Sequence, residues 1–414
     1  MTYTEHTMRF YLPFLAFAIL PAIIDLYLAR FIQLQFSSSA KIKLRRILHG
    51  INITTFVLTV SGLAYIFANK PGSESVDYYQ RIFLFLSLVL SAYLPKLMLI
   101  IFLILHDITL LVLKLSRKNH RLVRLRRVFL RISLIPGLLV FLLAIYGISY
   151  GKFQFETRRE TILSDQLPDA FKGYKVVQLS DFHIGCYLGH EDKLREVVRI
   201  VNDLKPDLLV FTGDMVNNSA EELRPLIPIL QEMEAKDGKY AILGNHDYGN
   251  YTQWESPEAR QRNQDALLAG IREAGFELLL NERREIFREG QKINLIGVEN
   301  YGKPPFPTYG DLAKATAGAD TTTFSILLSH DPSHWDMQVL GTFIDLTLSG
   351  HTHGMQAGIE SWGIQWSPAQ YKYPRWAGLY QEGSQYLYVN RGIGYMGFSG
   401  RIGIWPEVSI LDLY

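Results

Sequence analysis

The stretch VVQLSDFH, residues 176–183, contains the pattern that decides the fold of the C-terminal half. Its apolar residues predict a short buried strand over Val176–Ser180, and Asp181 and His183 follow where that strand ends. Four later stretches repeat the order of an apolar strand followed by Asp, Asn or His. They are Leu208–Thr212 before Gly213-Asp214, Tyr240–Leu243 before Gly244-Asn245-His246-Asp247, Phe324–Ser329 before His330-Asp331, and Leu346–Ser349 before Gly350-His351-Thr352-His353-Gly354.

Helix-like segments alternate with these strands. The predicted helices are Glu191–Leu204, Glu221–Ala235 and Glu258–Ala274, and the two further predicted strands are Ile293–Val298 and Tyr386–Val389. Tyr301–Thr323, rich in Pro, Gly, Ala and Thr, predicts a long surface loop. Alternating strands and helices are typical of an α/β layered domain.

The polar residues at the strand ends are expected to gather in one place. The carboxyl ends of the strands of an open α/β sheet meet at one edge, where ligands bind. Asp, Asn and His supply the oxygen and imidazole ligands that hard or borderline divalent metals prefer. One such block alone is typical of a turn or a cap. Five blocks in this order predict a metal site, and the neighbouring glycines allow the sharp turns that it needs.

From about Tyr174 to its C-terminus, the chain resembles the calcineurin-like metallophosphoesterases. The resemblance rests on the series Asp181-x-His183, Gly213-Asp214, Gly244-Asn245-His246-Asp247, His330 and Gly350-His351-x-His353. The tail Tyr388–Gly394, followed by Arg401 and Pro406-Glu407, resembles the bacterial membrane-associated subgroup, which includes UDP-diacylglucosamine pyrophosphatases. The resemblance implies a β-sandwich flanked by helices, with a two-metal site at its rim. It does not extend to residues 1–150.

Carried over to this sequence, the resemblance implies two divalent metal ions. Asp181, His183 and His353 would bind one ion, Asn245, His330 and His351 would bind the other, and Asp214 would bridge them. Because no ligand position is missing, an inactive relative is disfavoured. A bridging carboxylate holds two cations about 3.5–4 Å apart, where they clamp a phosphate and activate a water molecule. These ligands suit Mn, Fe or Zn, and the residue types do not choose among the three metals.

Two residues beside Asn245 complete the expected catalytic set. His246 is not an expected ligand, and it could either stabilise the phosphoryl oxygens or protonate the leaving group. Asp247 would either orient His246 through its carboxylate or cap the turn.

Other residues near these blocks have two interpretations each. Guanidinium groups pair well with phosphate, so three arginines are candidates for binding the substrate: Arg375, Arg391 and Arg401. An aromatic-rich stretch follows the last expected ligands, and its members would either pack in the domain or face lipid: Trp362, Trp366, Tyr371, Tyr373 and Trp376.

The 414 residues divide into two parts of opposite charge. Residues 1–150 contain 17 Lys and Arg against five Asp and Glu, a net charge of +12, and the remainder has a net charge of −10. Hydrophobic residues make up 48% of the chain and charged residues 20%, which excludes a disordered protein. The single cysteine, Cys186, excludes an internal disulfide framework and a Cys-rich zinc site.

Four apolar runs lie in residues 1–150: Phe10–Ala29, Ile47–Ala68, a run within Ile82–Leu113, and Ile132–Tyr150. The first, second and fourth runs have the roughly 20 residues that one membrane span needs. The third is longer and contains Pro95-Lys96, so we expect one long or kinked span, with a hairpin of two short spans as the alternative. Pro21 and Asp25 within the first run argue against a cleavable signal peptide. We therefore expect a membrane domain over residues 1–150, a connector over 151–173 and a phosphoesterase domain over 174–414.

The charge of the loops predicts the orientation of the spans. Arg30–Arg46 contains five basic residues and Lys114–Arg131 contains eight, whereas the charges of Asn69–Arg81 balance. Basic loops remain in the cytoplasm, so the N-terminus and the catalytic half are expected to be extracytoplasmic. The basic loops would also attract anionic membrane lipids, and no nucleic-acid partner is expected. Asp25, Lys96 and Asp107 lie in or near the spans and are candidates for a functional role or for contact with the interface.

Together these patterns predict a membrane-anchored two-metal hydrolase of phosphomonoester, phosphodiester or pyrophosphate bonds. A short connector would keep the site near the lipid headgroups, which favours a lipid-linked or membrane-proximal phosphorylated substrate. The alternatives are a metal-dependent sensor or binding module, and a lipid-handling membrane protein with an accessory phosphoesterase domain. The sequence leaves the substrate and the oligomeric state open.

Overall fold

The computed structural model describes residues 19–33, 41–68, 76–115, 132, 134–304 and 306–414. The chain divides into two compact units. One comprises Met1–Lys70 and Leu84–Tyr146, and the other comprises Pro71–Phe83 and Gly147–Tyr414.

Long apolar helices make up the first unit. Residues 19–33 are helical, and α2 (Ile42–Ala68), α3 (Val76–Leu115) and α5 (Leu134–Ser149) follow, with residues 76–83 of α3 and 147–149 of α5 assigned to the second unit. Among the described residues, three helical segments are long and apolar enough to cross a membrane: Ile42–Ile66, Tyr79–Val112 and Leu134–Phe153. The third apolar run is one helix that continues through Pro95, as expected, and not a hairpin. Residues 10–18 of the first expected span, residues 34–40 of the first basic loop and residues 116–131 of the second lie outside the described residues.

The charged residues within the expected spans have partners. Lys96 Nζ lies 2.7 Å from Asp25 Oδ1, and the Tyr93 hydroxyl donates to Asp25 Oδ2 at 2.8 Å. Asp107 Oδ2 accepts a hydrogen bond of 2.8 Å from the Tyr27 hydroxyl. All three contacts join the helix of residues 19–33 to α3. Charged groups within a bilayer are costly unless they are paired, so these contacts favour one packing of the two helices.

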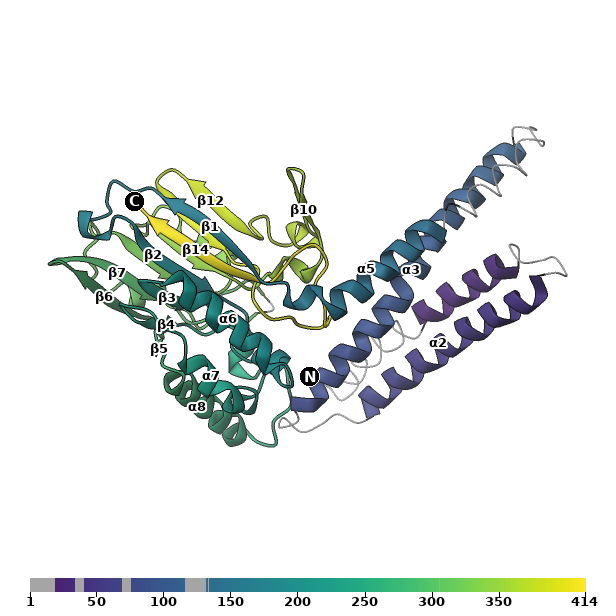
Figure 1. The fold of residues 1–414 in the computed structure, drawn as a ribbon, viewed down its shortest axis with the longest axis horizontal. Coiled ribbons are helices and arrows are strands. Elements are labelled where there is room, and N and C mark those ends of the chain that lie inside the picture. The colour runs from purple at the N-terminus through teal and green to yellow at the C-terminus, as the bar shows by residue number, and fades with distance from the viewer. Residues whose placement is uncertain (1–18, 34–40, 69–75, 116–131, 133, 305) are drawn as a thin grey trace, which may run out of the picture. The chain divides into compact units, whose positions relative to one another are not determined.

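Two six-stranded mixed sheets form the framework of the second unit (Figure 1). The first sheet has the order β1 (Glu156–Ile162), β14 (Glu407–Leu413), β2 (Tyr174–Leu179), β3 (Leu208–Phe211), β4 (Lys239–Ala241) and β5 (Glu277–Leu278). The second has the order β12 (Gly378–Glu382), β13 (Gln385–Val389), β9 (Leu346–Ser349), β8 (Ser325–Leu328), β7 (Gln291–Gly297) and β6 (Glu282–Arg288). The five strands expected to carry the ligands are present as β2, β3, β4, β8 and β9, and they divide between the two sheets.

Strand β1 lies in the segment that the sequence predicted as a connector. It pairs in parallel with β14, from Glu156 opposite Glu407 to Ile162 opposite Leu413. Residues 156–162 are therefore a strand of the sheet. Their sequence, ETRRETI, has only one apolar residue, because β1 is an edge strand that buries little apart from Ile162. The apolar pattern that reveals a central strand is absent from it.

The helices of the second unit are α6 (Glu191–Leu204), α7 (Ile227–Gln231), α8 (Pro257–Glu273) and α9 (Leu312–Ala315). The expected helix over Glu221–Ala235 is wrong in its extent. Two 3₁₀ turns, Ala220–Glu222 and Arg224–Leu226, replace its first half, and α7 is short. Pro225 and Pro228 explain the difference, because proline cannot donate the backbone hydrogen bond that a continuous helix needs.

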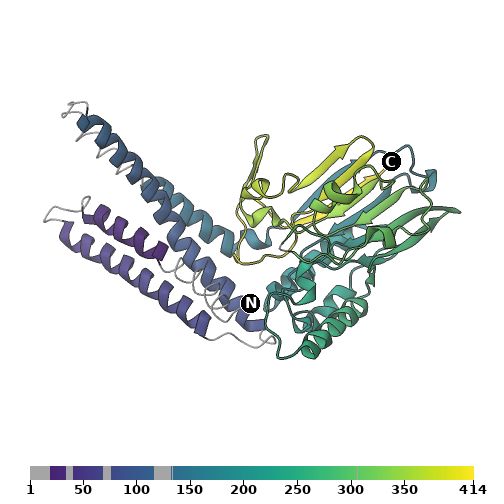
Figure 2. The same cartoon turned by 180° about the vertical axis from the view of Figure 1, so that it is seen from behind.

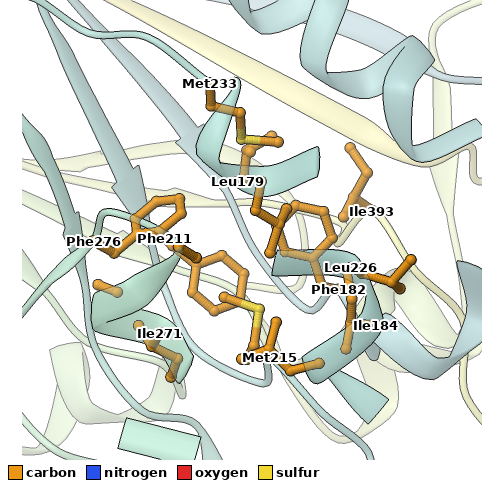
Figure 3. Packing of buried hydrophobic residues seen from close by; sticks show 14 of the residues in the cluster. Leu179, Phe182, Ile184, Phe211, Met215, Leu226, Met233, Ile271, Phe276 and Ile393 are labelled. Atoms are coloured by element: carbon orange, nitrogen blue, oxygen red, sulfur yellow. The ribbon is translucent and has the colours of Figure 1, made fainter. Parts of the chain in front are cut away.

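Alternate residues of the central strands pack into different cores. In β3, Leu208 and Val210 join the core between the two sheets, whereas Leu209 and Phe211 join the core beneath α6, α7 and α8. Figure 3 shows Phe211 in the helix-side core. A third core surrounds Trp335 on the other face of the second sheet. The unit is a β-sandwich flanked by helices, as predicted, and Figure 2 shows its sheets from behind.

Candidate metal centre

The polar residues of the five blocks all follow the carboxyl ends of their strands. Asp181 and His183 follow β2, Asp214 follows β3, and Asn245 follows β4 in the first sheet. His330 follows β8, and His351 and His353 follow β9 in the second sheet. Because both sheets present these ends on the same side of the sandwich, side chains up to 172 residues apart in sequence, Asp181 to His353, come together.

The first cluster consists of Asp181, His183 and His353, and all three side chains are buried. The Nε2 atoms of His183 and His353 are 3.1 Å apart, and His353 Nε2 lies 3.4 Å from Asp181 Oδ1. The three ligand atoms lie within 4.8 Å of one another, which is close enough to hold one metal ion.

The second cluster consists of Asp214, His330 and His351. His330 Nε2 lies 3.2 Å from Asp214 Oδ2 and 3.2 Å from His351 Nδ1. The same oxygen of Asp214 is 3.8 Å from His183 Nε2 of the first cluster. Asp214 therefore lies between the two clusters.

The polar atoms at this site are arranged more suitably for binding a metal ion than for hydrogen bonding to one another. Two pairs of imidazole nitrogens face each other at hydrogen-bond distance, so each pair directs lone-pair or N–H positions toward one point. Asn245 Oδ1 is buried and has no hydrogen-bond partner among the described residues. Buried oxygen atoms normally have a partner, and a cation would supply one. The donor set of oxygen and imidazole nitrogen suits divalent metals such as Mn, Fe and Zn.

The backbone at the site is strained. Five of the expected ligands have left-handed backbone conformations, which cost about 1–3 kcal/mol each for residues other than glycine. They are Asp181 (φ 51°), His183 (42°), Asp214 (61°), His351 (73°) and His353 (49°). Glycine makes the tight approach possible, since a Cβ atom on Gly213 would lie 2.6 Å from the backbone nitrogen of Gly244. Strain of this kind persists only where surrounding contacts hold it, and it is common at functional sites.

Burial and nearby charge shift the pKa values of the imidazoles at the site. Burial lowers the pKa of His183 to about 3 and the pKa of His351 to about 4, so both rings are neutral near pH 7. Burial acts in the same direction on His330, but the charge of Asp214 and the hydrogen bond to it raise the pKa of His330 to about 10. Since a ligand imidazole must be neutral, cation binding would release a proton from His330.

His246 projects beside the clusters and is partly exposed. Its Nδ1 lies 2.8 Å from the carbonyl oxygen of Asn217, and its ring meets the ring of His183 edge to face, with 4.9 Å between centroids. A carbonyl oxygen can only accept, so Nδ1 carries the hydrogen and Nε2 is left for another partner.

Asp247 does not orient His246 through its carboxylate, which was one of the two roles expected for it. The hydrogen bonds that its carboxylate accepts in the described part of the chain come from the backbone N–H groups of Asp214, Met215, Val216 and Gly244, at 2.8–3.2 Å. Asp247 therefore caps the turn and fixes the backbone that carries Asp214. The carbonyl of Asn217 holds the ring of His246 instead.

Two tyrosines lie at the site that the sequence pattern does not identify as site residues. The Tyr251 hydroxyl accepts a hydrogen bond of 2.9 Å from Asn245 Nδ2, and its ring lies 4.5 Å from the ring of His246. The Tyr373 hydroxyl lies 2.7 Å from His351 Nε2. Such contacts orient metal-binding side chains. No local motif marks them, and Tyr373 stood out only as a member of an aromatic-rich stretch.

Two of the arginines expected to bind substrate phosphate form ion pairs with carboxylates of the protein instead. Arg391 is buried, with Nη1 2.5 Å from Glu407 Oε2 and Nη2 2.5 Å from Glu360 Oε1. Arg375 lies 2.5 Å from both Asp336 and Glu382. These pairings do not support a phosphate-binding role for either residue.

Arg401 has a different setting. It is fully buried and donates to backbone carbonyls of Arg391, Gly392 and Gly394. Its Nη2 also lies 3.3 Å from His353 Nδ1. The position beside a candidate ligand favours an orienting role for Arg401 over direct contact with substrate.

Comparison with known proteins agrees with this geometry. The model of the family described as "Calcineurin-like phosphoesterase" matches residues 174–355. The model described as "Probable Calcineurin-like phosphoesterase, transmembrane domain" matches residues 8–152. The two matches cover both parts of the chain.

Several known proteins are similar to more than half of the chain. The chain is 33% identical over 276 residues to the uncharacterized metallophosphoesterase YkuE of Bacillus subtilis, a match that covers 64% of this chain and 90% of that protein. It is 31% identical over 280 residues to a transmembrane protein with metallophosphoesterase domain from Danio rerio, covering 66% of this chain and 60% of that protein. It is 30% identical over 286 residues to the UDP-2,3-diacylglucosamine pyrophosphatase LpxG of Chlamydia trachomatis, covering 57% of this chain and 83% of that protein.

The fold and the site define a metal-dependent phosphoester hydrolase. The chain belongs to the calcineurin-like phosphoesterases, and within them it is a membrane-associated metallophosphoesterase with an N-terminal transmembrane region.

The ion pairs of Arg391 with Glu360 and Glu407 predict a loss of stability when the arginine is removed. In Arg391→Ala, Glu360 and Glu407 lose their buried partner, so we expect the free energy of unfolding to fall by about 3–5 kcal/mol. Arg375→Ala is the control, because its ion pairs are more exposed and should contribute about 1 kcal/mol or less. Denaturant unfolding of the detergent-purified protein measures both. An Arg391→Ala protein with unchanged stability and a raised KM would instead support the phosphate-binding role.

Proposed function

We propose that this protein uses two divalent metal ions to hydrolyse a P–O bond in a phosphomonoester, phosphodiester or pyrophosphate carried by a membrane lipid. The observation that carries the proposal is the position of Asp214. Its Oδ2 lies 3.2 Å from His330 Nε2 in one cluster and 3.8 Å from His183 Nε2 in the other. A carboxylate shared by two ligand clusters is what a two-metal hydrolase requires.

In this proposal the first cluster binds one ion, and Asn245 joins the two histidines of the second cluster in binding the other. Asp181, His183 and His353 hold one ion, Asn245, His330 and His351 hold the other, and Asp214 bridges them. When bound, the ions would supply an activated water molecule and offset the negative charge of the phosphate. Mn, Fe and Zn all suit these ligands.

His246 has the geometry of a proton donor to the leaving group. Because its Nδ1–H is held by the carbonyl of Asn217, a second proton can only be carried on Nε2. That proton would pass to the leaving oxygen as the P–O bond breaks, and solvent would then restore it. Tyr251 packs against the ring and limits its rotation. Asp247 contributes by holding the backbone of Asp214 and Gly244.

A lipid-linked substrate is supported by the anchor and by one relative. The apolar helices keep the catalytic unit next to a bilayer, where a soluble substrate would gain little from the anchor. One similar protein is named as a pyrophosphatase of UDP-2,3-diacylglucosamine, which is a nucleotide-linked lipid. The substrate of the present enzyme would combine acyl chains in the membrane with a phosphate or pyrophosphate at its surface.

The proposal is tested by a substrate screen of the full chain. The detergent-purified protein, loaded in turn with Mn, Fe or Zn, would be offered lipid phosphates, nucleotide-linked lipids and matched water-soluble esters. We expect a higher kcat/KM for the lipid-linked compounds. Equal or higher kcat/KM for the soluble esters would contradict a lipid substrate while leaving the hydrolase activity intact.

The bridging role of Asp214 predicts a loss of metal. Asp214→Asn keeps the volume but removes the charge that holds two cations together, so we expect one ion to be lost per chain. Turnover should fall at least about a hundredfold, since even partners that only orient ligands contribute about 10–100-fold. Asp345→Asn is the control, because this buried carboxylate binds the backbone of Ser325 at the opposite ends of β8 and β9. Native mass spectrometry would count the ions, and two retained ions in Asp214→Asn would remove it from the bridge.

The role of His246 predicts a dependence on the leaving group. His246→Ala should keep both ions and its thermal stability but lose about 10²–10⁴-fold in turnover. The loss should be smaller for a nitrophenyl ester, whose leaving group needs no proton. Rates for a series of esters with different leaving-group pKa values measure this difference. Equal losses across the series would make His246 an electrostatic stabiliser, and full activity would exclude it from catalysis.

We also propose that the catalytic unit is extracytoplasmic, because the loops Arg30–Arg46 and Lys114–Arg131 are strongly basic. Single cysteines at Ser384 and Ser116, placed in a Cys186→Ala background, test this orientation. Ser384 is exposed in the turn between β12 and β13, and Ser116 belongs to the second basic loop. A membrane-impermeant thiol reagent should label Ser384→Cys in whole cells and Ser116→Cys only after lysis. The reverse pattern would place the catalytic unit in the cytoplasm.

A further inference from the structure

A small hairpin follows the last two candidate ligands in the chain. Strands β10 (Ile359–Ser361) and β11 (Ile364–Trp366) pair antiparallel, with Ile359 opposite Trp366 and Ser361 opposite Ile364. They form a two-stranded sheet of their own, which projects from the catalytic unit (Figure 1).

The two faces of this hairpin differ in chemistry, because side chains alternate along a strand. On one face, the carboxylate of Glu360 lies 2.5 Å from Arg391 and 2.8 Å from Arg158. On the other face, Ile359, Ile364 and Trp366 are 46%, 54% and 39% exposed. Buried ion pairs thus fix the hairpin to the domain while its apolar face is left to solvent.

The tip of the hairpin is a tryptophan in a strained conformation. Trp362 and Gly363 form the two-residue turn, with φ values of 53° and 76°. Both values belong to the type I′ turn, in which Asn-Gly and Asp-Gly are the favoured pairs. A bulky residue in the left-handed region is uncommon. Trp362 is also 94% exposed, so packing within the described protein does not account for a tryptophan at this position.

Backbone hydrogen bonds connect the base of the hairpin to the end of the fourth apolar run. The candidate membrane span Leu134–Phe153 ends within the catalytic unit, where the carbonyl of Gly147 accepts from the backbone nitrogen of Arg401 at 3.3 Å. The next residue, Ile402, pairs with the segment that precedes β10, because its carbonyl accepts from Gly358 at 2.9 Å and it forms an isolated bridge with Ala357.

This connection is close and direct. A Cβ atom on Gly147 would lie 2.8 Å from the carbonyl oxygen of Arg401. A glycine is therefore needed for the end of the span to come this close to the loop that contains Arg401. One loop therefore separates the base of the hairpin from the last residues of the candidate span.

We infer that the β10–β11 hairpin inserts Trp362 and its apolar face into the bilayer interface and so brings the metal centre to the lipid headgroups. Tryptophan is enriched at this interface, and apolar surface binds there in proportion to the area buried. A membrane partner outside the protein explains both the exposed apolar face and the strained tryptophan. Because this role presupposes a membrane-borne substrate, it rests on the function proposed above.

The hairpin is also linked to the candidate ligands on both sides. The turn His353–Gln356 leads into it, and Tyr373, which follows it, lies 2.7 Å from His351 Nε2. Insertion of the tip would therefore set the height of these ligands above the membrane surface.

A fluorescent probe can measure the depth of the tip without any turnover. In a Cys186→Ala background, Trp362→Cys would be labelled with an environment-sensitive dye, and the full chain would be reconstituted into phospholipid vesicles. Phe287→Cys is the matched control, since Phe287 is 64% exposed on β6, at the opposite edge of the second sheet from β12. We expect lipids with a nitroxide on the acyl chain to quench the dye at 362 and not the dye at 287. Equal quenching by aqueous iodide at both positions would overturn the inference.

A second variant separates membrane contact from folding. Trp362→Asn creates the favoured Asn-Gly turn, so thermal stability should stay the same or rise. The ratio of lipid-ester to soluble-ester turnover in the same vesicles should fall at least about fivefold, because a tryptophan contributes strongly to interfacial binding. Phe287→Ser should leave this ratio unchanged.

The outcomes distinguish the hairpin from the function. If the wild-type protein hydrolyses no lipid ester but the dye at 362 is quenched from the acyl region, the substrate proposal fails and the membrane contact holds. If lipid esters are hydrolysed but Trp362→Asn does not change the ratio and the dye remains in water, the hairpin inference fails. In detergent, iodide quenching of the dye at 362 that decreases as the protein concentration rises would show that a second copy of the chain covers the apolar face. That result would also overturn the hairpin inference.

Discussion

The carboxylate of Asp214 lies between two groups of histidines, and the arrangement of the candidate site depends on that position. The backbone that carries Asp214 is held by Asp247, whose carboxylate accepts hydrogen bonds from four backbone N–H groups in the two loops that follow β3 and β4. This network fixes the backbone of Asp214 in a left-handed conformation that would otherwise be unfavourable. The sandwich supplies the rest, because both of its sheets direct strand ends toward the same point. Three cores, one between the sheets and one on the outer face of each sheet, hold these strand ends in place.

A second buried charge, Arg391, has a comparable structural importance. It joins Glu407 at the start of β14 to Glu360 on the hairpin, and Arg158 on β1 also reaches Glu360. The strand at the edge of the first sheet, the end of β13 and the hairpin are therefore held through one set of ion pairs. Removing one partner from such a buried set leaves an uncompensated charge, which is far more damaging than losing an exposed pair. The arrangement explains how a hairpin with an exposed apolar face can keep a defined position.

Much of the site could be predicted because its signals are local. A short apolar run followed by Asp-x-His, Gly-Asp, Asn-His-Asp or His-x-His identifies both the strand and the polar residues at its end, and all of these residues follow the expected strands. The long apolar runs likewise predict membrane helices, since length and composition alone decide whether a segment can cross a bilayer. Strand β1 gave no such signal, because an edge strand with one buried apolar residue has the composition of a loop.

The amino-acid sequence alone determined which residue types are available as ligands, where the strands of the catalytic unit end, and which segments are apolar enough for a membrane. Only the tertiary structure decided how individual polar side chains are used. In the folded chain Arg391 pairs with two carboxylates, and the carboxylate of Asp247 accepts hydrogen bonds from the backbone. The carbonyl of Asn217 sets the tautomer of His246. The physical reason is that these choices depend on contacts between residues far apart in the chain, whereas a sequence pattern records only the preferences of neighbours. The exposure of Trp362 belongs to the same class, because an aromatic residue in a turn becomes informative only when the fold leaves it without a packing partner among the described residues.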